Sequence, residues 1–283
     1  MKLTRLSKLG ALAAAGALSL GSAIAGPTYP PPPAPVPPPP PPPPIEEGGG
    51  LFDSMGMSIA VGYDTDYVFR GYKIGHDYVW SQVDLSIPLG DNLEFAVGAW
   101  YTTAFNDAED VNELDVYGSL AYDFGVVGVE VGYIHYAYPN TPGEFFLGAP
   151  FGGEGSNGDE TNEVYAKVGT TFFEAVDVSL AWYYDLDLEV SYIEGAVATS
   201  FPLGSFVSLD PTVGVSYVDI DDAPPGVEDN DWNHFFAKLA LPIRLTETAT
   251  LTPYIAATAA LDLADDFGEG DYFWGGVSLS VDF

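Results

Sequence analysis

The sequence predicts an all-β protein, a transmembrane up-and-down antiparallel β-barrel of about 12 strands with short periplasmic turns and long outer loops. Three observations predict it. A leader for export begins the chain, apolar residues then alternate with polar or small ones in segment after segment, and the links between those segments alternate between short and long. Strands of about ten residues are long enough to cross a bilayer at a tilt.

The leader comes first. Lys2, Arg5 and Lys8 precede an apolar run from Leu9 that ends in small residues at Ala25. This pattern is typical of a cleavable signal peptide, so residues 1–25 are assigned to one. No later segment has the roughly 20 apolar residues of a transmembrane helix. The chain has no cysteine, which excludes a lipid-modified N-terminal cysteine, disulfides and thiolate metal sites.

Residues 26–50 are dominated by proline and end in Gly48–Gly50. Proline lacks a backbone donor and has a restricted φ, so this segment is expected to run as extended polyproline II. We assign it to a periplasmic linker. It is either a stiff spacer or a docking peptide for a periplasmic partner on the cell wall. Residues 51–283 then form the outer-membrane barrel.

The period of two is the strongest signal in this region. Met57, Ile59 and Val61 take one face of the first segment, while Ser58 and Ala60 take the other. The same alternation recurs in eleven further segments, around Val83/Leu85, Phe95/Val97, Val116/Leu120, Val129/Val131, Val164/Val168, Val178/Leu180, Val197/Phe201, Val213/Val215, Leu239/Leu241, Leu251/Ile255 and Val277/Leu279. A soluble β-sandwich also alternates. Small and acidic residues opposite every apolar face favour the barrel.

The links between segments fall into two classes. Short turns follow the even-numbered segments, and mostly long polar loops follow the odd ones, except for a tight link near Asp185–Leu188. An even number of strands puts both termini on the short-turn, periplasmic side. Aromatic residues at segment ends match the girdles of a barrel, with Phe124, Phe172, Phe201 and Phe283 at the short-turn rim and Tyr63, Tyr78, Trp80, Tyr101, Tyr133, Trp182, Tyr184, Tyr217 and Trp274 at the long-loop rim. Pro211 and Pro253 interrupt two segments, where we expect bulges.

The run Asp66-Tyr67-Val68-Phe69-Arg70-Gly71 follows the first segment. It resembles the signature of the TorF-like family of uncharacterised bacterial outer-membrane proteins. The closing Phe283 also resembles the terminal phenylalanine by which outer-membrane barrels are recognised by the insertion machinery. The resemblance implies an outer-membrane barrel and that partner, but no reaction. We expect Asp66, Tyr67 and Arg70 to form a motif at the rim, with Arg70 paired to a rim or lumen carboxylate.

Charge limits the partners. The chain has 8 Lys and Arg against 41 Asp and Glu, a net charge of −33, which excludes nucleic acid because phosphate binding needs the opposite sign. Many carboxylates lie in the expected outer loops: Asp107, Glu109, Asp110, Asp221, Asp222, Glu228, Asp229, Asp231, Asp265, Asp266, Glu269 and Asp271. They form either a solvated rim or one that holds divalent ions near lipopolysaccharide. Outer-membrane lipid and lipopolysaccharide are the expected surroundings.

Strand parity also predicts the lumen. It places inward Asp84, Glu94, Asp115, Glu130, Asp177, Glu194 and Asp210, opposed mainly by Lys167 and Lys238. Such a lumen would prefer cations. The sequence leaves two functions open. One is a narrow porin-like channel for small cationic or neutral solutes, and the other is a structural or adhesive barrel with a plugged lumen, tethered towards the cell wall.

An outer-membrane hydrolase is a third, disfavoured hypothesis. It would need a histidine near a nucleophile, and only His76, His135 and His234 are available, without a serine motif. His76, next to Asp77, is the best candidate base. We therefore expect no enzymatic activity, and no cofactor or metal.

Overall fold

The computed structural model describes residues 55–105, 112–139, 160–221 and 229–283. The expected signal peptide (1–25) and linker (26–50) lie outside the described residues, as do Asp107, Glu109, Asp110, Asp222 and Glu228 of the expected loops. The described chain is nearly all strand. The strands are β1 (Gly56–Phe69), β2 (Tyr72–Pro88), β3 (Leu93–Ala104), β4 (Glu113–Asp123), β5 (Gly128–Ala137), β6 (Glu160–Phe172), β7 (Val176–Asp185), β8 (Val190–Thr199), β9 (Phe201–Pro202), β10 (Ser208–Ile220), β11 (Asn230–Ala240), β12 (Ile243–Arg244), β13 (Ala249–Ala260) and β14 (Tyr272–Asp282).

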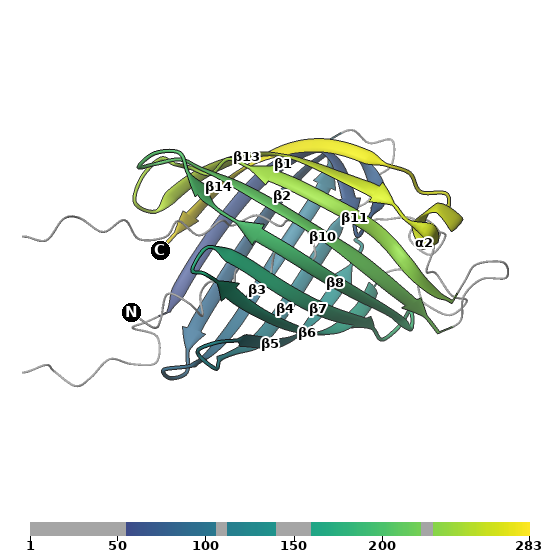
Figure 1. Cartoon of the computed structure of the whole chain (residues 1–283), viewed down its shortest axis with the longest axis horizontal. Helices are drawn as coiled ribbons and strands as arrows, with labels where there is room; N and C mark the ends of the chain where they lie inside the picture. The colour runs from purple at the N-terminus through teal and green to yellow at the C-terminus, as the bar shows by residue number, and fades with distance from the viewer. Residues whose placement is uncertain (1–54, 106–111, 140–159, 222–228) are drawn as a thin grey trace, which may run out of the picture.

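Twelve of these strands close into one antiparallel ring (Figure 1). Each long strand pairs with its neighbours in sequence, β9 and β12 are two-residue strands beside the ring, and β11 pairs directly with β13. The ring closes where β1 meets β14, from Ser58 opposite Asp282 to Asp64 opposite Gly276. The predicted barrel, its strand number and the pairing of the first strand with the last are thus confirmed.

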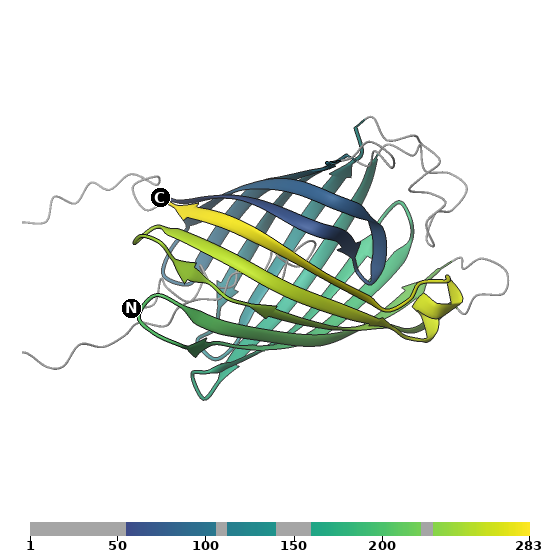
Figure 2. The same ribbon diagram turned by 90° about the horizontal axis from the view of Figure 1, so that it is seen from above.

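The two ends of the barrel differ. β1 begins and β14 ends at the same end, called here the short-turn end (Figure 1). The opposite end is called the loop end. It carries the links β1–β2, β3–β4, β5–β6, β7–β8, β10–β11 and β13–β14, the last of which contains α2 (Asp262–Asp266) (Figure 2). The β1–β2 link differs from the expected long loop. Asp66–Phe69 belongs to β1 itself, and only Arg70 and Gly71 separate it from β2.

The two faces of the wall have opposite chemistry. Apolar side chains at the predicted outward positions are exposed, as at Val131 (50%) and Leu180 (51%), whereas their neighbours Glu130 and Ala181 are buried. In a barrel the buried parity faces the lumen, so the exposed parity faces lipid. Phe124, Phe172, Phe201 and Phe283 are exposed, as expected of a girdle. Tyr78 and Trp80 are buried instead, which corrects their assignment to the rim, because from Tyr78 onward the even-numbered residues of β2 point inward.

The two strand prolines sit where a ladder is interrupted. β8 pairs with β10 only from Thr212, and β9 resumes the pairing at Leu209, so the gap faces Pro211. Likewise, the ladder from β11 reaches Tyr254 and the β12 pairs begin at Leu251, so the gap faces Pro253. On their other sides both prolines stay in continuous register. The expected bulges are therefore ladder gaps, because proline has no N–H to donate.

Within the residues described, no helix is long and apolar enough to cross a membrane.

Candidate functional site: the lumen

The predicted inner-wall carboxylates do face inward. Glu94, Asp115, Glu130 and Asp210 are buried, while Asp84 and Glu194 are partly buried on the same faces as buried neighbours. Asp177 shares the inward parity of β7 but lies exposed at the short-turn end, where it accepts a hydrogen bond from Thr171 at 2.6 Å. The two lysines lie on the same inner face, and both are buried.

Each lysine lies against aromatic rings. The Lys238 Nζ lies 4.0 Å from the ring centroid of Tyr254, and the Lys167 Nζ lies 4.8 Å from that of Tyr165. The Tyr165 hydroxyl donates to the Glu130 carboxylate at 2.7 Å. Stacking on aromatic faces stabilises a cation where water is scarce. These contacts leave most of the wall's negative charge without a partner of opposite sign.

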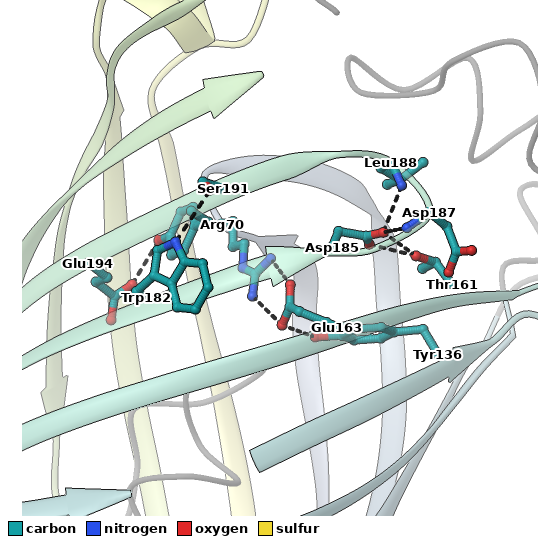
Figure 3. A network of polar contacts seen from close by, with 11 residues as sticks. Arg70, Tyr136, Thr161, Glu163, Trp182, Asp185, Asp187, Leu188, Ser191 and Glu194 are labelled. Carbon is teal, nitrogen blue, oxygen red and sulfur yellow. Dashed lines mark hydrogen bonds and ion pairs between the residues drawn. The ribbon is translucent and has the colours of Figure 1, made fainter. Parts of the chain in front are cut away.

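Arg70 lies inside the loop end of the barrel, where its guanidinium faces Glu163 (Figure 3). Its guanidinium makes a bidentate ion pair with Glu163 of β6, with N–O distances of 2.7 and 2.9 Å. The guanidinium carbon also lies 4.5 Å from the ring centroids of both Tyr183 and Tyr192. Burial lowers the pKa of Arg70, but the carboxylate of Glu163, together with Tyr136 and Tyr183, raises it, and the resulting pKa is well above the ordinary value. The predicted pairing of Arg70 with a carboxylate is confirmed.

The other residues of the Asp66–Gly71 motif also lie inside the loop end of the lumen or at its edge. Tyr67 is 5% exposed and its hydroxyl donates to Glu113 at 2.7 Å. Asp66 pairs with Lys73 and, at 2.6 Å, with His76, all three within the β1–β2 hairpin. The motif thus belongs mostly to the lumen rather than to the rim, because the hairpin that carries it turns inward.

Side chains fill the lumen at the level of Arg70. Glu113, Asp115 and Glu163 are each 1% exposed, and Tyr136, which donates to Glu163 at 3.1 Å, is 2% exposed. A water-filled pore would leave wall side chains accessible at this level. At this level of the lumen the described wall side chains are therefore packed against one another and the hairpin.

Sequence reasoning missed several inward carboxylates. Glu113 and Glu163 lie two and four residues from the predicted Asp115 and Lys167, so strand parity alone could have found them. Asp64 and Asp185 are also buried on inward faces. Asp64 accepts a hydrogen bond from Tyr254, and Asp185 accepts one from Thr161 at 2.6 Å.

Some of the buried oxygens have no hydrogen-bond partner among the described residues. They include one oxygen each of Glu94, Glu130 and Asp210. A buried carboxylate oxygen without a partner is costly, so the wall retains capacity to bind a donor or a cation. Among the residues described, no group of three His, Asp or Glu is arranged to hold a metal ion.

The histidines do not form a relay with a serine and a carboxylate among the described residues. His76 contacts Asp66, and His135 lies 3.0 Å from Asn162 and 3.7 Å from Glu160. His234 lies 2.7 Å from the Ser216 hydroxyl, but Asn233 contacts the same ring nitrogen, at 3.0 Å. A catalytic relay uses both ring nitrogens, one for the nucleophile and one for the orienting group.

Comparison with known proteins agrees with this geometry at the level of fold. No family model matches the chain, and neither does any curated protein. An outer-membrane channel from Pseudomonas putida F1 superposes with a TM-score of 0.51 at 12% identity, over 85% of this chain and 99% of that one. This chain has the fold of an outer-membrane β-barrel.

Two further solved structures superpose with lower TM-scores. The translocator domain of the autotransporter NalP from Neisseria meningitidis has a TM-score of 0.49 at 12% identity, over 84% of this chain and 91% of that one. The KdgM porin in complex with disordered oligogalacturonate also has a TM-score of 0.49, at 10% identity, over 80% of this chain and 99% of that one.

Proposed function

We propose that the protein is a narrow outer-membrane channel for small cations or neutral solutes. The observation that carries the proposal is the charge of the inner wall. Carboxylates from β2, β3, β4, β5, β6, β8 and β10 point inward, against the buried lysines Lys167 and Lys238 and the one inward arginine of the described residues. Fixed negative charge along a narrow path raises the local concentration of cations and lowers that of anions.

The test is the reversal potential of the purified, refolded protein in a planar bilayer under a salt gradient. We expect cation preference, and we expect Asp84→Asn to reduce it, because Asp84 lies on the inner face and is only partly buried. Glu247→Gln is the matched control, since Glu247 lies exposed in a turn at the short-turn end. Anion preference of the unmodified protein would contradict the proposal.

The filled loop end favours a second candidate, a structural barrel with a plugged lumen. The packed layer around Glu113, Glu163 and Tyr136 is the observation behind it. In that case the linker (26–50) would tether the barrel towards the cell wall, and lipid and lipopolysaccharide would be its main contacts. Absence of conductance under every condition, including deletion of residues 68–73 at the tip of the β1–β2 hairpin, would favour this candidate over the channel. The arrangement of the described histidines supports neither hydrolysis nor any other catalysis.

A further inference from the structure

We propose that the tip of the β1–β2 hairpin, Val68–Lys73 and called here the plug, is a movable gate that closes the lumen, with the Arg70–Glu163 ion pair as its latch. This inference rests on the proposed channel function and names the element that regulates it. It is carried by how the hairpin leaves the wall, what its tip contacts and what its departure would expose.

The hairpin is detached from the barrel wall beyond its base. The β1–β14 ladder ends at Asp64, and the β2–β3 ladder begins at Tyr78. Between these points the two strands pair only with each other, with a register shift at Tyr67/Val68. At the base, the Gly275 N–H donates to the Thr65 hydroxyl and the Phe105 N–H donates to the Asp77 carbonyl. At the tip, the main chain bonds to the described residues outside the hairpin only through their side chains, since the Lys73 N–H donates to Glu269 and the Arg70 carbonyl accepts from Asn233. The tip can therefore move without breaking a wall ladder.

The tip crosses the lumen to the far wall. β7 and β8 lie opposite β1 and β2 in the ring, yet Arg70 contacts Tyr183 of β7 and Tyr192 of β8 as well as Glu163 of β6. No residue lying in the wall at β1–β2 could reach these strands except through the lumen. In Figure 2 the dark-blue tip curves at the loop end of the barrel.

The backbone of the turn is built for this position. Arg70 and Gly71 have φ values of 51° and 94°, as in a two-residue hairpin turn with positive φ at both central positions. A Cβ at position 71 would lie 2.8 Å from His234 Cγ, so only glycine lets the turn approach β11. Asn233 donates to the Arg70 carbonyl at 2.9 Å and accepts from the Tyr72 hydroxyl at 2.9 Å.

Besides these polar contacts, aromatic packing holds the tip: the Phe69 ring lies edge-on to Tyr136, and the Tyr72 ring lies edge-on to Phe267. A two-stranded hairpin without further strand partners is only marginally stable, so the side-chain contacts decide where its tip lies. The latch also places a tethered cation among Glu113, Asp115 and Glu163, where a permeating cation would pass. When the tip leaves, these carboxylates face water and form an acidic mouth. Opening and cation preference thus come from the same residues.

The chain contains no cysteine, so a disulfide can hold the plug in place without competing thiols. Gly71→Cys/His234→Cys removes the imidazole that a side chain at 71 would meet. A Cβ at 71 lies 3.1 Å from His234 Cβ, so a shift of less than about 1 Å brings the two Cβ atoms to the roughly 3.8 Å of a disulfide. We expect the two cysteines to form a disulfide in the folded barrel. The folded form is identified by its heat-modifiable electrophoretic mobility. This readout reports the plug's position independently of conductance. Failure to oxidise in folded protein would show that the tip does not sit at His234 and would overturn the proposal.

Planar-bilayer recording then tests the gate. We expect the oxidised pair to stay closed and the reduced pair to open, and Glu163→Gln to raise the open probability of the barrel at least about tenfold. Arg244→Gln, which changes an exposed arginine at the short-turn end, is the control and should behave as the unmodified protein. Equal conductance of the oxidised pair, Glu163→Gln and unmodified protein would refute the gate but leave the channel. If the disulfide forms and no variant conducts, the channel itself is refuted, and with it the gate.

Discussion

The Arg70–Glu163 pair should be energetically coupled, and a double-mutant cycle can measure by how much. Glu163→Leu removes the carboxylate while the Arg70 side chain stays only 14% exposed, and two hydrogen bonds of 2.7 and 2.9 Å are lost. Removing one partner of a buried pair costs about 3–5 kcal/mol, because the other charge is left uncompensated. We expect each of Glu163→Leu and Arg70→Leu to lower the free energy of unfolding by that amount.

The double variant Arg70→Leu/Glu163→Leu buries neither charge. Its loss should be smaller than the sum of the single losses by about 2–3 kcal/mol, within the range of residues in direct contact. Urea unfolding of the barrel in lipid vesicles, followed by the fluorescence of its five tryptophans, gives the four free energies. Arg244→Leu should change the free energy by no more than about 0.5 kcal/mol. Single effects that add to within about 0.5 kcal/mol would refute the coupling.

Three further predictions use the same unfolding assay or the bilayer. Gly71→Ala should destabilise the barrel more than Gly268→Ala. Both glycines have positive φ, but only at Gly71 would the new Cβ meet a side chain, that of His234. Equal losses of stability would show that the turn has space for a Cβ. Leu180→Arg should cost about 2–4 kcal/mol in lipid, since Leu180 is exposed on the outer face, and a neutral effect would contradict that orientation. Lys167→Gln should increase cation preference in reversal-potential measurements. Raising the salt concentration from about 0.1 M to 1 M should weaken that preference, because the Debye length shortens from about 10 Å to 3 Å. An unchanged preference in either case would argue against control by the wall charge.

The candidate site was only partly accessible from the sequence. Strand parity placed Asp115 and Glu130 on the inner wall, because a β-strand sends successive side chains to opposite faces. Both residues do lie on the inner face. Aromatic character alone, however, predicts Tyr78 and Trp80 at the rim, whereas parity places them in the lumen. The inward carboxylates Glu113 and Glu163 followed from parity and were missed, because they lie close to the strand ends, where a loop and a strand look alike.

The sequence by itself determined the class of fold, the outward and inward faces, the closure of the first strand on the last and the acidic lumen, because a period of two and its apolar face are local properties. Only the tertiary structure decided that the first hairpin turns inward. Its alternation up to Tyr67 is that of a wall strand, and nothing local distinguishes the two. Its position depends on Glu163, Tyr192 and Asn233, which lie far along the chain and reach Arg70 and Tyr72 only once the ring has closed.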